Sequence, residues 1–124
     1  MASTQAVEFG KSAEDRACQE LLRQGYAILA RRYRTRVGEI DIVARDGSVV
    51  VFVEVKARAD NHCGHPAESV TLWKQRRIAA MATDYLTRHR LHHAPCRFDV
   101  VAITGAEGEP QRVDVIREAF WVDV

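Results

Sequence analysis

Four charged side chains interrupt two apolar stretches near the middle of the chain. Residues 38–58 read GEIDIVARDGSVVVFVEVKAR, and the four residues are Glu39, Asp41, Glu54 and Lys56. Strands bury apolar side chains and an unpaired buried charge is costly, so charges repeated at the strand period of two need a functional reason. Carboxylate oxygens suit Mg²⁺ and Mn²⁺, and such an ion can activate a water against a phosphodiester. The stretch is therefore a candidate phosphodiesterase site.

The spacing of these residues predicts a hairpin that brings them together. The two apolar runs flank Asp46-Gly47, a dipeptide typical of a two-residue type I′ turn. This turn predicts that Arg45 lies opposite Ser48, which makes Asp41 a diagonal neighbour of Glu54 on the same face. The face that carries the charges consists of Glu39, Asp41, Phe52, Glu54 and Lys56. The opposite, apolar face consists of Ile40, Ile42, Val51, Val53 and Val55.

In this arrangement the hairpin provides the ligands of a metal site and a lysine that acts on the attacking water. Asp41, Glu54 and the Val55 backbone carbonyl supply hard oxygen ligands, and Lys56 orients or deprotonates the attacking water. Glu14 lies on or beside the buried face of the preceding helix, an awkward place for a carboxylate unless a cation meets it. From there it could reach the same centre through a water.

The alternative is that Asp41 and Glu54 merely pair with Lys56 and Arg58 on a solvated face. Glu39 is expected to face solvent or to support the site rather than to bind metal. Asp99 is expected to be structural or accessory rather than catalytic.

The remaining sequence predicts the elements that hold this hairpin. A helix is expected from an N-cap at Ser12 to about Gln24, where Gly25 ends it. Further elements are expected as a strand at 26–33, a helix at 71–88, and strands at 97–103 and 112–116. This order predicts an α/β fold with a mixed sheet flanked by helices. We expect one domain over residues 1–124, with 1–10 as a flexible lead-in.

Composition narrows the class of protein. The chain has 124 residues, of which 47% are hydrophobic and 28% charged, which is typical of a folded domain with its own core. The longest apolar run, Val49 to Val53, is too short to span a membrane. Three widely spaced cysteines argue against a disulfide framework and favour the cytoplasm. The net charge of +1 means that nucleic-acid contacts would have to come from local basic clusters.

Several polar residues are candidates for nucleic-acid contacts. They are Arg32, Arg34, Arg36, Arg58, Lys74 and Gln75. Lys74 and Gln75 could instead be exposed residues of an ordinary helix start, and the sequence leaves this alternative open. The cysteines and histidines at 62–65 and 92–96 match no zinc-binding spacing, so the sequence favours Mg²⁺ or Mn²⁺ over zinc.

The segments GEIDIVA and FVEVKAR together resemble the PD-(D/E)XK nuclease signature. Across nearly the whole chain, through Glu14, GYAILARRYR, the helix start at Lys74 and RFDVV, the sequence resembles the YraN family of uncharacterised bacterial proteins. More distantly it is similar to archaeal Holliday-junction resolvases. Ile40 stands where the signature has its proline.

The resemblance implies a restriction-endonuclease-like αβββαβ core. It also implies Asp41, Glu54 and Lys56 as the catalytic set, with Glu14 as an accessory acid. The implied activity is a Mg²⁺- or Mn²⁺-dependent nuclease acting on nucleic acid, with branched DNA as one expected substrate. A homodimer is expected by analogy with the junction-cutting relatives, which must cut two strands. A non-catalytic nucleic-acid-binding module and a purely structural or protein-binding domain stay open.

Overall fold

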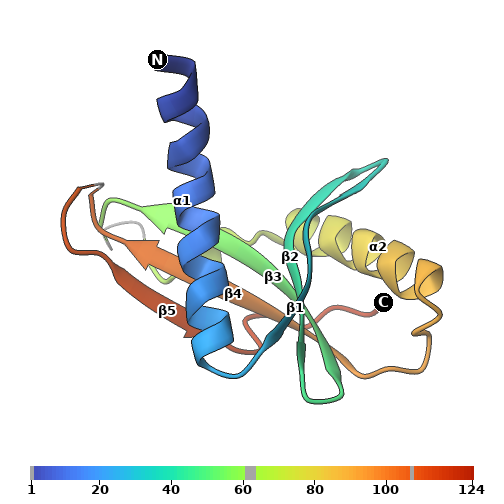
Figure 1. Ribbon diagram of the computed structural model, residues 1–124. Helices are drawn as coiled ribbons and strands as arrows, with labels where there is room; N and C mark the ends of the chain where they lie inside the picture. Colours follow the sequence, from blue (N-terminus) through green and yellow to red (C-terminus); the bar gives the residue numbers. More distant parts are fainter. Residues whose placement is uncertain (1, 61–63, 107) are drawn as a thin grey trace.

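The computed structural model describes residues 2–60, 64–106 and 108–124, which form a five-stranded mixed sheet between two α-helices (Figure 1). The elements are α1 (Ala2–Arg23), β1 (Ala27–Thr35), β2 (Gly38–Asp46), β3 (Val49–Arg58), the 3₁₀ helix η1 (Pro66–Ser69), α2 (Leu72–Arg88), β4 (Cys96–Thr104) and β5 (Arg112–Ile116). The strands lie in chain order. β3 and β4 are parallel and joined through α2, and the other neighbouring pairs are antiparallel. The predicted α/β class and the order of the αβββαβ core are confirmed.

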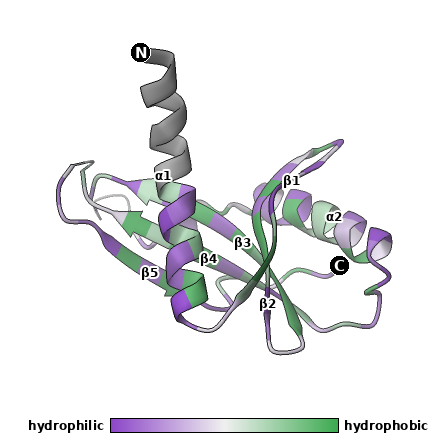
Figure 2. Cartoon of the chain, viewed as in Figure 1, coloured by the Kyte–Doolittle hydropathy of each residue, from purple (hydrophilic) through white to green (hydrophobic). Residues whose placement is uncertain are grey.

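Each α-helix covers one face of the sheet, because β3 and β4 are apolar on both faces (Figure 2). The α1 side consists of Ala17, Cys18 and Leu21 packed on Ile42, Ala44, Val51, Val53, Val101 and Ile103. The α2 side consists of Ile78, Met81, Ala82, Tyr85 and Leu86 packed on Ile40, Val43, Phe52, Phe98 and Val100. The segment after β5 also packs on the α2 side, where Phe120 stacks on Phe98 with ring centroids 5.1 Å apart. Within the described ranges, neither helix is long and apolar enough to cross a membrane.

Helix α1 starts earlier than the sequence predicts. Its first residue is Ala2, so the helix start predicted at Ser12 is wrong and α1 includes most of the predicted lead-in. The physical reason is helix propensity, because five of residues 2–11 are alanine, glutamine, glutamate or lysine. The predicted end is confirmed, since α1 stops at Arg23 and Gly25 has the positive φ of 95° that a helix terminator adopts.

The turn between β2 and β3 differs from the predicted one by one position. Asp46 pairs with Val49, so the two-residue loop is Gly47-Ser48 rather than Asp46-Gly47. The positive φ lies at Gly47, at 61°, where a type II′ turn places its glycine. This leaves Asp46 in the ladder, where it meets Arg97 at 3.1 Å. The register moves by two residues, so Val43 rather than Asp41 lies opposite Phe52, and the parity of the paired residues is unchanged.

A cluster of polar side chains is buried where β4 begins. Asp99 is fully buried and accepts hydrogen bonds from the Tyr26 hydroxyl at 2.9 Å and from Arg97 Nε at 2.9 Å. The backbone N–H of Glu118 donates to the same carboxylate at 3.1 Å. The cluster therefore ties β4 both to the start of β1 and to the segment after β5. These contacts give Asp99 a structural role, one of the two roles, structural or accessory, that the sequence predicts for it.

Raising the pH through 10 to 12 is expected to destabilise the protein through Tyr26. Burial, followed by the hydrogen bond to Asp99, raises the pKa of Tyr26 from 10.0 to about 12. The pKa of Tyr26 is higher in the folded state than in the unfolded state, so the folded state holds its phenol proton more tightly. The resulting stabilisation is complete below pH 10 and is lost as the pH rises to 12. The loss in the free energy of unfolding is on the order of 2 kcal/mol. Absorbance titration at 295 nm should show a late-ionising tyrosine that disappears in Tyr26→Phe. A Tyr26 that ionises near pH 10 would contradict this.

Candidate active site

The alternation of side chains along β1 and β2 breaks at Arg32 and Asp41. Tyr33 pairs with Ile40 on the α2 side of the sheet, whereas Arg31 pairs with Ile42 on the α1 side. Arg32, between these pairs, has a positive φ of 51°, which is uncommon for a residue other than glycine. The prediction that Ile40 and Ile42 share a face is therefore wrong. The conformation of Arg32 places Arg31 and Tyr33 of β1 on opposite faces, and their β2 partners Ile42 and Ile40 lie on opposite faces with them.

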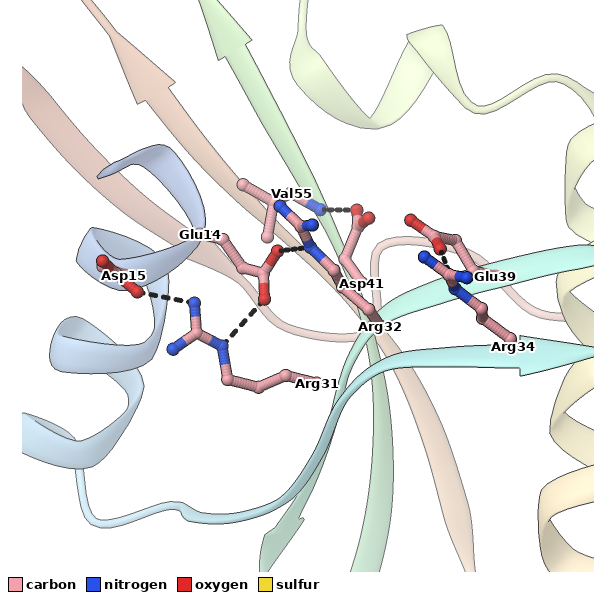
Figure 3. A network of polar contacts seen from close by, with 8 residues as sticks. All are labelled: Glu14, Asp15, Arg31, Arg32, Arg34, Glu39, Asp41 and Val55. Atoms are coloured by element: carbon pink, nitrogen blue, oxygen red, sulfur yellow. Dashed lines mark hydrogen bonds and ion pairs between the residues drawn. The ribbon is translucent and has the colours of Figure 1, made fainter. Parts of the chain in front are cut away.

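Asp41 occupies the point where β2 and β3 separate. Their ladder ends at the pair Ile42–Val53. Just beyond it, Asp41 Oδ2 accepts a hydrogen bond from the backbone N–H of Val55 at 2.8 Å (Figure 3). The Asp41 carboxylate thus accepts a hydrogen bond from a backbone N–H that would bond to β2 if the pairing of β2 and β3 continued. This bond fixes the Asp41 carboxylate between the two strands, beside Glu54.

Asp41 and Glu54 are neighbours in the folded protein. The hydrogen bond from the Val55 N–H holds the Asp41 carboxylate beside the residue that follows Glu54, and the charge of Asp41 acts on Glu54. Burial raises the pKa of both groups, and burial together with the Asp41 charge raises the pKa of Glu54 to about 7. Lys74 and Lys56 act in the opposite direction and lower the pKa of Glu54. Two half-buried, neighbouring carboxylates whose pKa values are both raised form a site that a cation would stabilise.

The oxygen atoms present fit a hard divalent ion. Asp41 and Glu54 offer carboxylate oxygens, which Mg²⁺ and Mn²⁺ prefer. In the part of the chain that the structure describes, no three histidine, cysteine, aspartate or glutamate residues form a metal-binding group. A metal held by these two carboxylates would therefore need further oxygens from backbone or water, as Mg²⁺ sites commonly use.

Glu14 is held by two arginines. It is only 7% exposed, and its oxygens Oε1 and Oε2 accept hydrogen bonds from Arg31 Nε and Arg32 Nε, both at 2.8 Å (Figure 3). Arg31 also donates to Asp15 at 2.6 Å. These are the cations that a carboxylate at this inward position requires. The conformation of Arg32 allows two successive arginines to reach the same carboxylate.

Two cavities flank the carboxylate pair. The first, of about 330 Å³, is lined by Ala13, Glu14, Arg32, Glu39, Asp41, Val55 and Ala57. The second, of about 110 Å³, is lined by Glu39, Glu54, Lys74, Arg77, Ile78 and Met81. Asp41 lines the first cavity, on the α1 side of the sheet, and Glu54 lines the second, on the α2 side, so the two carboxylates do not line one common face as the sequence predicts. Glu39 lines both cavities. The centre of the site is acidic, with Arg32 on one side and Lys74 and Arg77 on the other.

The other predicted basic residues lie around this site in different environments. Lys56 is half-buried on β3 and close enough to Glu54 to lower its pKa. Arg34 lies 3.5 Å from Glu39, and Arg36 is exposed in the turn between β1 and β2. These positions bring Lys56 and Arg34 to the edge of the site.

Two of the predicted nucleic-acid contacts point into the protein. Gln75 Nε2 donates to the Val70 carbonyl at 3.0 Å, which ties its amide to the start of α2. Arg58 Nε and Nη2 are buried and have no hydrogen-bond partner within the described residues. Of the loop residues considered for zinc, His62 and Cys63 lie outside the described residues.

Arg77 is the site residue that the sequence pattern does not single out. It lies three residues after Lys74, and this helical spacing places both side chains on one face of α2. The sequence shows that the start of α2 is basic. It does not indicate which of these basic side chains lines the cavity of Glu54.

Comparison with known proteins places the chain in a family. Residues 13–103 match the model of the uncharacterised protein family UPF0102. A UPF0102 protein of Symbiobacterium thermophilum is 46% identical over 111 residues, which cover 90% of this chain and 94% of the relative. UPF0102 proteins of Desulforapulum autotrophicum and Ralstonia nicotianae are 45% and 44% identical, covering 96% and 95% of this chain and 98% and 90% of theirs. The resemblance to the YraN family is confirmed: the chain belongs to the YraN-like UPF0102 family.

Proposed function

We propose that the protein is a divalent-metal-dependent nuclease that hydrolyses phosphodiester bonds in nucleic acid, with DNA as the expected substrate. The observation that carries this proposal is the position of the Asp41 carboxylate, which the Val55 N–H holds next to Glu54 at the point where β2 and β3 separate. Cations on both sides of the pair suit a phosphate backbone that crosses an acidic centre. The free thiols of Cys18 and Cys96 are compatible with the cytoplasm as its location.

Asp41, Glu54 and the Val55 backbone carbonyl would hold Mg²⁺ or Mn²⁺. When bound, such an ion lowers the pKa of a water and neutralises charge that develops on the phosphoryl group. The hydrogen bond from the Val55 N–H holds Asp41 in position before any ligand arrives. Lys56 would orient the attacking water or accept its proton, because it follows Glu54 by two residues on the same strand.

Glu14 is proposed to act through its arginines. Both of its oxygens are engaged by Arg31 and Arg32, so its contribution is to hold Arg32 in the cavity beside Asp41. A guanidinium fixed through Nε keeps its terminal N–H groups for a phosphate oxygen. This assigns Glu14 as a positioning residue and Arg32 as a phosphate contact.

Metal-dependent cleavage by the purified protein tests the proposal. Labelled four-way junction, duplex, single-stranded DNA and RNA are each incubated with Mg²⁺, Mn²⁺ or EDTA. We expect at least one substrate to be cut with Mg²⁺ or Mn²⁺ and none in EDTA. No cleavage of any substrate, together with no Mn²⁺ binding by electron paramagnetic resonance, would overturn the proposal. Nucleic-acid binding that survives Asp41→Ala and Glu54→Ala, without cleavage by the wild type, would identify a non-catalytic module instead.

A homodimer is proposed by analogy with junction-cutting enzymes. Sedimentation equilibrium of the purified chain measures its oligomeric state directly.

A further inference from the structure

A tryptophan stands exposed at the start of α2, beside the proposed active site. The Trp73 side chain is 64% exposed, although tryptophan is usually well covered in a folded protein. Its neighbour Leu72 is 60% exposed. These residues follow the N-cap Thr71, whose hydroxyl accepts a hydrogen bond from the Lys74 N–H at 3.2 Å, so they belong to a well-formed first helical turn.

The indole ring of Trp73 is supported by Arg77. The guanidinium carbon of Arg77 lies 4.8 Å from the centroid of the Trp73 ring, which is cation–π geometry. Arg77 Nη2 also donates to the Val37 carbonyl in the turn between β1 and β2. Gly38 makes room for this contact, because a Cβ added there would lie 2.6 Å from Arg77 Nη2. The ring is thus backed by a side chain that is itself anchored to another element.

The same arginine lines the cavity that contains Glu54. Lys74 and Arg77 both line that cavity, so the side chain that backs the indole ring also borders the cavity of Glu54. Lysine and arginine suit a phosphate, and an exposed indole face suits a nucleobase. An aromatic face beside two cations thus offers a partner for a base and a partner for its phosphate on one helical turn.

We propose that Trp73, backed by Arg77, stacks an unpaired nucleobase next to the phosphate held at Lys74 and Arg77. This inference rests on the proposed nuclease function and names its substrate class: a strand with unpaired nucleotides beside the scissile phosphate. A continuous duplex keeps its bases stacked on one another, so it offers no free base face to the indole. Burial of Trp73 against a second copy is disfavoured, because it would bring two sets of Lys74, Arg76 and Arg77 together.

Tryptophan fluorescence gives a direct test. The chain has two tryptophans, so Trp121→Phe leaves Trp73 as the only reporter. Oligothymidylate and a blunt duplex of equal length are titrated separately in EDTA, which prevents metal-dependent cleavage. We expect the single strand to quench Trp73 and the duplex to leave its emission nearly unchanged. In fluorescence-anisotropy titrations, Trp73→Ala should weaken single-strand binding by about 10-fold or more, and Trp73→Phe should retain most of the affinity.

Two further variants distinguish base stacking on the indole from general apolar contact at the start of α2. Leu72→Ala removes an equally exposed apolar side chain from the same helical turn and should leave single-strand binding unchanged. Gly38→Ala should displace Arg77 and weaken binding while Trp73 is kept.

The inference is overturned if Trp73 emission does not respond to single strands, or if Trp73→Ala binds them as tightly as the wild type. It is also overturned if the Trp73 emission shifts to the blue with protein concentration as a dimer forms. Because these titrations need no metal, quenching without any cleavage would refute the nuclease proposal alone. Cleavage without quenching would refute the stacking alone.

Discussion

Glu54→Gln is expected to lower metal-dependent cleavage by about 100-fold or more. The substitution keeps the size of the side chain and removes its charge from the pair that it forms with Asp41. Loss of one charged ligand weakens the hold on the cation and the charge compensation that the cation provides in the transition state. Initial cleavage rates at saturating Mn²⁺, with the most rapidly cut substrate, measure the effect. Asp41→Asn is expected to behave alike, because Asp41 is the other half of the pair.

The loss should not come from unfolding. Glu54→Gln removes a carboxylate whose charge is made unfavourable by burial and by the charge of Asp41, so in EDTA the variant should be at least as stable to urea as the wild type. Glu109→Gln, an exposed carboxylate in the loop between β4 and β5, is the matched control and should retain full activity. A Glu54→Gln protein that keeps more than half of the wild-type rate would rule out this carboxylate as a metal ligand.

Asp99→Ala is expected to reduce the free energy of unfolding by about 3–5 kcal/mol. Asp99 is fully buried and accepts hydrogen bonds from the Tyr26 hydroxyl, from Arg97 and from the backbone N–H of Glu118. Alanine would leave the guanidinium of Arg97, whose side chain is 14% exposed, with Asp46 as its remaining carboxylate partner, and it would remove the acceptor of the buried Tyr26 hydroxyl and of the Glu118 N–H. Truncating one member of a buried ion pair costs far more than the pair contributes, because the remaining charge stays buried.

Urea unfolding followed by circular dichroism measures this cost. Asp114→Ala is the matched control, because Asp114 pairs with Arg112 at 2.8 Å on a surface where the two side chains are 39% and 73% exposed. That variant should lose less than about 1 kcal/mol. Equal losses in the two variants would show that the Asp99 cluster is no more stabilising than an exposed pair.

The overall fold could be predicted because its signals are local and regular. The apolar runs on either side of Gly47, the helix-ending Gly25 and the amphipathic segment of α2 each define an element. The parity of the hairpin was also predictable, because a two-residue loop at either candidate position leaves the faces of the paired residues unchanged. A misplaced turn therefore did not alter which residues share a face within the ladder.

The part of the site that could not be predicted depends on the break in side-chain alternation at Arg32 and Asp41, which lies beyond the last pair of the β2–β3 ladder. The positive φ of Arg32 has no signal in its residue type, because arginine rarely adopts this conformation. It is stabilised by the ion pair with Glu14, which joins two elements distant in sequence. Likewise, nothing in the sequence around Trp73 distinguishes an aromatic residue held over Arg77 from one packed in the core. Such contacts depend on tertiary structure.

The unusual course of β1 has a consequence for how copies of the protein behave toward one another. β1 is an outer strand of the sheet, and an outer strand with free backbone groups can recruit a strand from another molecule. The pairing of β1 with β2 shifts register between Ile28 and Ala30, and Arg32 departs from the regular strand conformation. Arg31 and Arg34 add positive charge to the same strand. Irregularity and positive charge are the means by which natural sheets resist edge-to-edge aggregation. The residues that flank the acidic centre thus also protect the open edge of the sheet.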